Sequence, residues 1–186
     1  MPSMRTFIAI DLTPEIKNEL TRWQEAFRGL SSGAQWARPG GTHLTLKFLG
    51  EITEEHAARV VRALQQSKAS PRFTLEVKGL GFFPDARRPR VFWVGVLAPP
   101  ELGQLAARVE AALEDLGFAR ETRPFSPHLT LARFREPRPQ PALREAAEMQ
   151  SELVLGRLDV TEFFLYESKL RLQGAEYRKV ASFPLC

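Results

Sequence analysis

Cysteine and histidine are scarce in this chain of 186 residues, and each scarcity narrows the chemistry that the protein can perform. The single cysteine is Cys186, so no disulfide can form within the chain and no cysteine cluster can hold a metal ion. Only three histidines are present. No glycine pattern of the Walker or dinucleotide-binding type occurs, which argues against a phosphate held in a glycine-rich loop.

Long apolar runs are also missing. The apolar stretch 7–10 ends at Asp11, which makes it too short for a signal-peptide core or a membrane span. We therefore expect a soluble, cytoplasmic protein without a membrane partner. Apolar residues make up 44% of the chain, which is ordinary for a folded protein with a hydrophobic core.

Basic residues outnumber acidic ones by 26 to 22, and 20 of the basic residues are arginine. The planar guanidinium group suits phosphate better than the point charge of lysine does. Genome composition or adaptation to heat explains the same ratio equally well. The composition therefore permits a phosphate-bearing partner without identifying one.

The chain contains the tetrapeptide His-Leu-Thr-Leu twice, at 43–46 and 128–131. In a β-strand successive side chains point to opposite faces, so histidine and threonine share one face and the leucines share the other. Two such strands brought together would supply two imidazoles and two hydroxyls to one place. This set of groups suits acid–base chemistry on a phosphate.

Both halves of the chain predict the same order of elements: helix, His-Leu-Thr-Leu strand, helix, strand, strand. We expect one α+β domain over residues 1–186, made of two lobes that correspond approximately to 1–98 and 99–186, with strands that can exchange between lobes. A parallel doubly wound sheet is the alternative, but strands joined without helices favour antiparallel pairing. The predicted helices cover 14–30, 53–66, 100–116 and 142–149. The predicted strands cover 5–10, 42–49, 73–77, 91–97, 128–134, 153–160, 163–170 and 177–183, with a loop at 79–90.

Other site chemistries fit the sequence less well. A metal centre is disfavoured because neither motif contains a cysteine or an acidic residue to complete a ligand set. Ser126 lies two residues before His128, but no acidic partner or nucleophile elbow accompanies it. What remains is metal-free chemistry by two imidazoles, one taking and one giving a proton.

The paired motifs, in the strings HLTLKFLG and PFSPHLTLARF, resemble the 2H phosphoesterase superfamily. They are most similar to its bacterial and archaeal RNA 2′,3′-cyclic phosphodiesterase branch, historically called 2′-5′ RNA ligase. The segments 4–10 and 90–93 also resemble that branch. The resemblance implies a bilobal α+β fold of pseudo-two-fold symmetry, with antiparallel sheets flanking a central cleft and helices outside. It implies neither a metal nor a cofactor.

The resemblance also implies roles for the motif residues. One histidine activates water and the other protonates the departing 3′ oxygen, so that a 2′,3′-cyclic phosphate opens to a 2′-phosphate. We expect His128 to be the base and His43 the acid, although identical motifs do not distinguish them. Thr45 and Thr130 would bind the non-bridging phosphate oxygens.

Four further residues are predicted to contact substrate. Arg133 stands where the family has a phosphate-binding arginine, yet simple alternation puts it on the face opposite His128 unless the strand bulges. Lys47 shares the His43 face by the same alternation and is expected near the phosphate. Phe48 and Phe125 are candidates for stacking on a terminal base.

The sequence thus predicts a metal-independent phosphodiesterase that acts on RNA 3′ ends or small cyclic nucleotides. The alternatives are 2′-5′ ligation or cleavage, another cyclic-nucleotide activity of this superfamily, and an RNA-end-binding module without turnover. No obligate protein partner is indicated, and a monomer is expected.

Overall fold

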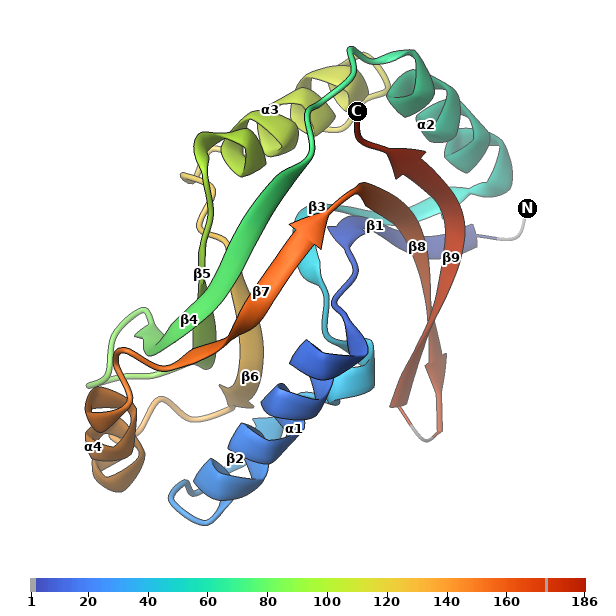
Figure 1. Cartoon of the computed structure of the whole chain (residues 1–186). Helices are drawn as coiled ribbons and strands as arrows, with labels where there is room; N and C mark the ends of the chain where they lie inside the picture. Colours follow the sequence, from blue (N-terminus) through green and yellow to red (C-terminus); the bar gives the residue numbers. More distant parts are fainter. Residues whose placement is uncertain (1–2, 173) are drawn as a thin grey trace.

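Two antiparallel sheets with helices on their outer sides make up the computed structural model, which describes residues 3–172 and 174–186 (Figure 1). The predicted α+β class is confirmed, and the parallel alternative is wrong because every strand pair is antiparallel. The first sheet has the order β3-β1-β8-β9 and comprises β1 (Ser3–Ile10), β3 (Leu44–Thr53), β8 (Glu162–Arg171) and β9 (Gly174–Pro184). The second has the order β2-β6-β5-β4-β7 and comprises β2 (Ala34–Trp36), β4 (Phe73–Phe83), β5 (Val91–Leu97), β6 (His128–Phe134) and β7 (Val154–Val160).

The helices begin where the sequence predicts, because their N-terminal signals are local. The Thr13 hydroxyl accepts a hydrogen bond from the Ile16 backbone N–H at the start of α1, and Thr53 does the same for His56 at the start of α2. The described residues form α1 (Pro14–Arg28), α2 (Glu54–Gln66), α3 (Pro100–Glu114), α4 (Pro141–Met149) and the short 3-10 helix η1 (Pro39–Gly41).

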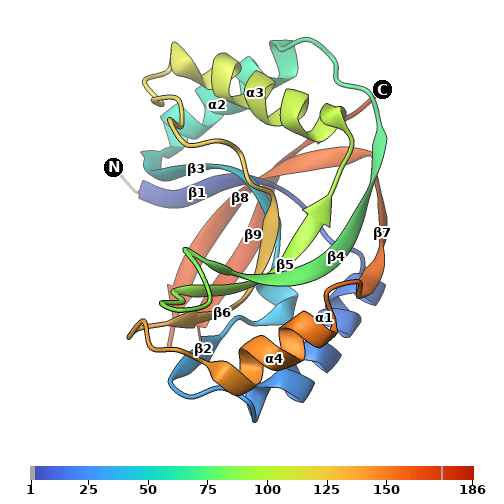
Figure 2. The ribbon, with the colours of Figure 1, turned by 90° about the vertical axis from the view of Figure 1, so that its left-hand side faces the viewer.

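The sheets lie between two layers of helices (Figure 2). Helices α2 and α3 pack against β3 of the first sheet, whereas α1 contacts β7 and α4 contacts β4 of the second. The motif leucines point toward these helices and are almost fully buried: Leu44, Leu46, Leu129 and Leu131 are 1%, 5%, 0% and 1% exposed. Burial of this kind contributes roughly 1.5–3 kcal/mol per side chain. The leucines therefore anchor both motif strands. The histidine and threonine of each motif lie on the opposite face of the sheet.

Neither sheet follows one half of the sequence. The first sheet takes β1 and β3 from the first half and β8 and β9 from the second half. The second sheet likewise combines β2, β4 and β5 with β6 and β7. That residues 1–186 form a single domain stays a prediction.

The segment 79–90, which we predicted as a loop, continues the strand β4 as far as Phe83. Gly79 adopts φ +77° at the register shift between Val77 and Leu80, so it forms an irregularity inside the strand. The loop prediction was wrong because the sequence alone does not show whether a glycine in an apolar segment ends a strand or bends it. Among the described residues, no helix has the length and apolar character needed to cross a membrane.

Candidate active site

The two motif strands lie in different sheets, β3 in the first and β6 in the second. We call the sheet faces that carry His43 with Thr45, and His128 with Thr130, the motif faces. Helices pack on the opposite faces, so both motif faces are turned toward the space between the sheets (Figures 1 and 2). Among the described residues, no hydrogen bond is formed by either threonine side chain, which leaves both hydroxyls available.

The strand β3 contains a bulge at the last residue of its motif. Ala9 of β1 pairs with Thr45 and Ile8 pairs with Lys47, so Leu46 is an extra residue without a partner. Beyond the bulge, Phe7 pairs with Phe48. Because Phe7 and Ala9 lie two positions apart in β1, Phe48 lies on the same face as Thr45.

The strand β6 contains a bulge at the equivalent position. Trp93 of β5 pairs with Thr130 and Phe92 pairs with Ala132, which leaves Leu131 as the extra residue. Val91 then pairs with Arg133. Arg133 therefore lies on the motif face with Thr130, because the bulge shifts the alternation of side chains by one residue. In a regular strand Arg133 would lie on the opposite face.

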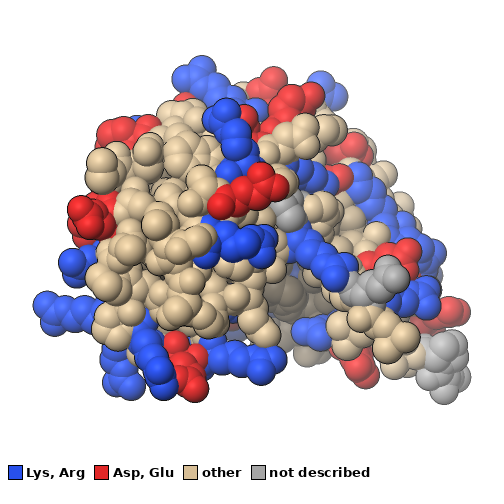
Figure 3. All heavy atoms as spheres, turned by 90° about the horizontal axis from the view of Figure 1, so that it is seen from below, with Lys and Arg blue, Asp and Glu red and all other residues tan. Residues whose placement is uncertain are grey.

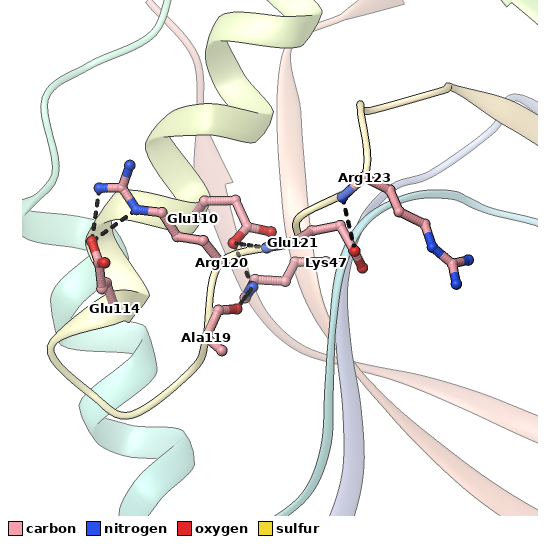
Figure 4. A network of polar contacts seen from close by, with 7 residues as sticks. All are labelled: Lys47, Glu110, Glu114, Ala119, Arg120, Glu121 and Arg123. Atoms are coloured by element: carbon pink, nitrogen blue, oxygen red, sulfur yellow. Dashed lines mark hydrogen bonds and ion pairs between the residues drawn. The ribbon is translucent and has the colours of Figure 1, made fainter.

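The prediction that Lys47 shares the His43 face is wrong, because the bulge turns it toward the helices. Its side chain is buried, and its Nζ lies 2.6 Å from Glu110 Oε2 of α3 and 2.8 Å from the Ala119 carbonyl (Figure 4). Glu110 also accepts a hydrogen bond from the Glu121 backbone N–H. Lys47 thus ties the first motif strand to α3 and to the loop that leads toward His128.

Aromatic rings surround His43. The ring centroids of Tyr166, Tyr177 and Phe7 lie 4.3, 5.1 and 5.6 Å from that of His43. Burial among these rings lowers the pKa of His43 to about 4, against an opposing effect of the Asp11 carboxylate. His43 is therefore neutral near pH 7 in the free protein.

His128 is oriented by its own backbone segment. Its Nδ1 lies 2.8 Å from the Ser126 carbonyl oxygen, and a neutral imidazole satisfies this acceptor by carrying its proton on Nδ1. Nε2 then presents a lone pair. The ring of Phe83 stands edge-on to His128, with centroids 4.9 Å apart. Ser126 therefore contributes its carbonyl group to the orientation of His128.

A charged cluster beside His43 was not predicted from the sequence. Asp11 Oδ1 lies 2.9 Å from Lys17 Nζ, and Asp11 Oδ2 lies 2.7 Å from Lys179 Nζ. Burial by itself raises the pKa of Asp11, but the hydrogen bonds from Lys179 and Lys17 outweigh it and lower this pKa to about 2. Burial also raises the pKa of the neighbouring Tyr166 hydroxyl, which stays protonated. Asp11 lies in the loop after β1, whereas Lys17, Tyr166 and Lys179 come from α1, β8 and β9, so no single local pattern could have identified them all.

The two residues predicted to stack on a base lie in different settings, Phe48 in a strand and Phe125 in a loop. The side chain of Phe48 is 71% exposed, and its ring centroid lies 6.0 Å from that of Phe7 on the motif face. Phe125 is exposed in the loop three residues before His128.

Basic side chains spread more widely than acidic ones over the face seen in Figure 3.

Comparison with known proteins agrees with this arrangement. The sequence matches the family described as LigT like Phosphoesterase over residues 10–93 and 95–177, and each stretch contains one motif. An RNA 2′,3′-cyclic phosphodiesterase of Archaeoglobus fulgidus is 34% identical over 97% of this chain and 99% of its own length. One from Aquifex aeolicus is 32% identical over 100% of this chain and 99% of its own length.

Solved structures show the same fold. The crystal structure of Escherichia coli LigT complexed with 3′-AMP superposes with a TM-score of 0.80 at 28% identity, covering 99% of both chains. A protein of Thermus thermophilus superposes with a TM-score of 0.79 at 29% identity, covering 98% of both chains. With both stretches matched and both motifs in place, the chain belongs to the LigT-like phosphoesterase family, the 2H phosphoesterases.

Proposed function

We propose that this protein hydrolyses RNA 2′,3′-cyclic phosphate termini to 2′-phosphates without a metal ion. One observation carries the proposal: identical His-x-Thr motifs lie on two sheet faces turned toward the same space, with an arginine beside the second motif. The names of the full-length relatives, RNA 2′,3′-cyclic phosphodiesterase, support the same reaction.

In the proposed reaction a water oxygen attacks phosphorus while the bond from phosphorus to the 3′ oxygen breaks. His128 takes the water proton on Nε2, which the hydrogen bond from its Nδ1 to Ser126 leaves free. His43 gives a proton to the 3′ oxygen. Since His43 is neutral in the free protein, it must gain this proton as the anionic phosphate arrives and raises its pKa.

The remaining predicted contacts fit this geometry. Thr45 and Thr130 would donate their hydroxyl hydrogens to the non-bridging oxygens, where negative charge grows. Arg133 would add charge-assisted hydrogen bonds to the same oxygens. Phe48 and Phe125 would stack on the terminal base. We do not propose Lys47 as a substrate contact, because its ammonium group is held by Glu110.

The direct test is incubation of the wild-type protein with an oligonucleotide ending in a 2′,3′-cyclic phosphate, in the presence of EDTA. We expect ring opening to a 2′-phosphate, and a loss of roughly 10²- to 10⁴-fold in kcat for both His43→Gln and His128→Gln. The matched control is His56→Gln, because His56 instead bonds the Leu116 carbonyl and stacks on Phe118. No product from the wild type, or full activity in both motif variants, would refute the proposal.

Product analysis separates the proposal from other activities of the superfamily. A 3′-phosphate product, cleavage of 2′-5′ linkages or joined RNA ends would each indicate a different reaction. Tight binding of the RNA end without any product would indicate a binding module. We further propose that the protein is a monomer and that it acts in the cytoplasm. Size measurements in solution would test the first of these proposals, and cell fractionation the second.

A further inference from the structure

A side chain of α1 holds the bulge of β6. Gln24 lies within α1, is only 2% exposed, and donates from Nε2 to the Leu131 carbonyl at 2.9 Å and to the Ala37 carbonyl at 2.8 Å. Leu131 is the extra residue of the bulge, and its carbonyl also accepts a hydrogen bond from the Ala37 backbone N–H. Both hydrogens of the amide are therefore used at the point where β2 ends beside β6.

The equivalent bulge of β3 is held in another way. There Lys47, which follows the extra residue, bonds to Glu110 on α3. The corresponding residue of β6 is Ala132, whose methyl group cannot form a polar contact. Among the described residues, Gln24 provides the side-chain hydrogen bond to the second bulge.

Packing alone does not explain a glutamine at this position. The other buried residues of α1 are Ile16, Leu20 and Phe27, which form the apolar stripe of the helix. A buried amide in such a stripe is unfavourable unless its hydrogen bonds are satisfied. The Nε2 group of Gln24 meets this condition through its two hydrogen bonds, one of which fixes the direction of a carbonyl group in the bulge.

We infer that Gln24 is a positioning residue that acts on the phosphate through Arg133, an inference that rests on the proposed function. Without the bulge, strand alternation would turn Arg133 away from the motif face. By fixing the Leu131 carbonyl, Gln24 keeps the guanidinium group on the same face as His128 and Thr130.

The test is a double-mutant cycle between Gln24→Met and Arg133→Met. We expect each single variant to lower kcat/KM about 10- to 100-fold, because small displacements of positioning groups have effects of this size. We expect the double variant to lie within about twofold of Arg133→Met alone, because Gln24 acts through Arg133. The affinity for inorganic phosphate should show the same coupling.

A matched control separates positioning from general stability. Gln140 is another buried glutamine, 5% exposed, and its amide bonds to the backbone of Ser32. We expect Gln140→Met to lower thermal stability as much as Gln24→Met, yet to leave phosphate affinity unchanged. If Gln24→Met does not fold, Gln24→Asn takes its place, because its shorter amide cannot reach both carbonyls.

Unchanged phosphate affinity and kcat/KM in the Gln24 variant, or losses that multiply in the double variant, would overturn the inference. The phosphate measurements do not depend on turnover. If the wild type binds phosphate with the expected coupling but opens no cyclic phosphate, the proposed reaction fails while the role of Gln24 stands.

Discussion

Phe48 and Arg133 occupy equivalent places in the two motif strands, each five residues after its histidine and two residues after the extra residue of a bulge. Both side chains are exposed on their motif faces. The two motif strands therefore carry the same histidine and threonine but differ at the fifth residue after the histidine. The His43 motif face therefore carries an aromatic ring and the His128 motif face a guanidinium group, so the proposed nucleotide substrate would meet a different group on each face.

Phe48→Ala should weaken the recognition of the base and spare the chemical step. Loss of a stacking contact is worth about 1–3 kcal/mol, so KM for a nucleoside 2′,3′-cyclic phosphate should rise roughly 5- to 150-fold with little change in kcat. Ribose 2′,3′-cyclic phosphate, which lacks a base, should show no such effect. Met149→Ala is the control, because Met149 is 79% exposed on the outer helix α4. An equal loss with both substrates would contradict base stacking.

Lys47→Met should affect stability more than catalysis. It leaves Glu110 without its partner, and breaking such a pair should lower the free energy of unfolding by about 3 kcal/mol in denaturant titrations. The double variant with Glu110→Gln should recover part of this loss. Arg157→Met, which removes an exposed ion pair to Glu76, should cost less than about 1 kcal/mol. A large fall in kcat for folded Lys47→Met would show that Lys47 has a role in the reaction itself.

The pKa of His43 should respond to phosphate. NMR titration of the imidazole signals should give a pKa of about 4 for the free protein, because burial disfavours the charged ring. Inorganic phosphate should raise this pKa, since a nearby anion favours the imidazolium form. His43→Gln identifies the signal. A pKa near 6.5 without phosphate would contradict the proposed desolvation.

The same group should make stability depend on pH. Between about pH 6.5 and 4 the unfolded chain binds a proton at His43 that the folded protein does not, so stability should fall as the pH decreases through this window. Above about pH 6.5 the group should contribute no slope. In His43→Gln the free energy of unfolding should therefore decrease less over the same window, as measured by denaturant titration at each pH.

Gly41→Ala should disturb His43 through Tyr177. A Cβ atom on Gly41 would lie 2.5 Å from the Tyr177 ring, so the ring must move away from its place beside His43. We expect kcat/KM to fall several-fold, with a smaller effect in a Tyr177→Ala background. Gly103→Ala is the control, because space is open there and alanine suits the helix α3. Equal losses at both glycines would exclude a local effect.

Alternation along the strands predicted most of the motif faces but failed beyond the repeated tetrapeptide. It placed Lys47 on the wrong face and left Arg133 dependent on an irregular strand. The reason is that a bulge depends on the register with the neighbouring strand. The extra residues of the bulges, Leu46 and Leu131, are leucines that would fit a regular strand equally well, so residue type does not reveal the bulges.

The sequence by itself determined the repeated His-x-Thr unit, the helix starts and the antiparallel α+β class, because periodicity, capping residues and turn residues act locally. Only the tertiary structure decided which residues surround each histidine. Tyr166 and Tyr177 reach His43 because β8 lies beside β1 and β9 beside β8. Gln24 reaches Leu131 because α1 lies against Ala37, the residue after β2, which pairs with β6. Contacts between segments so far apart in the chain follow from strand order and packing, which local sequence patterns do not contain.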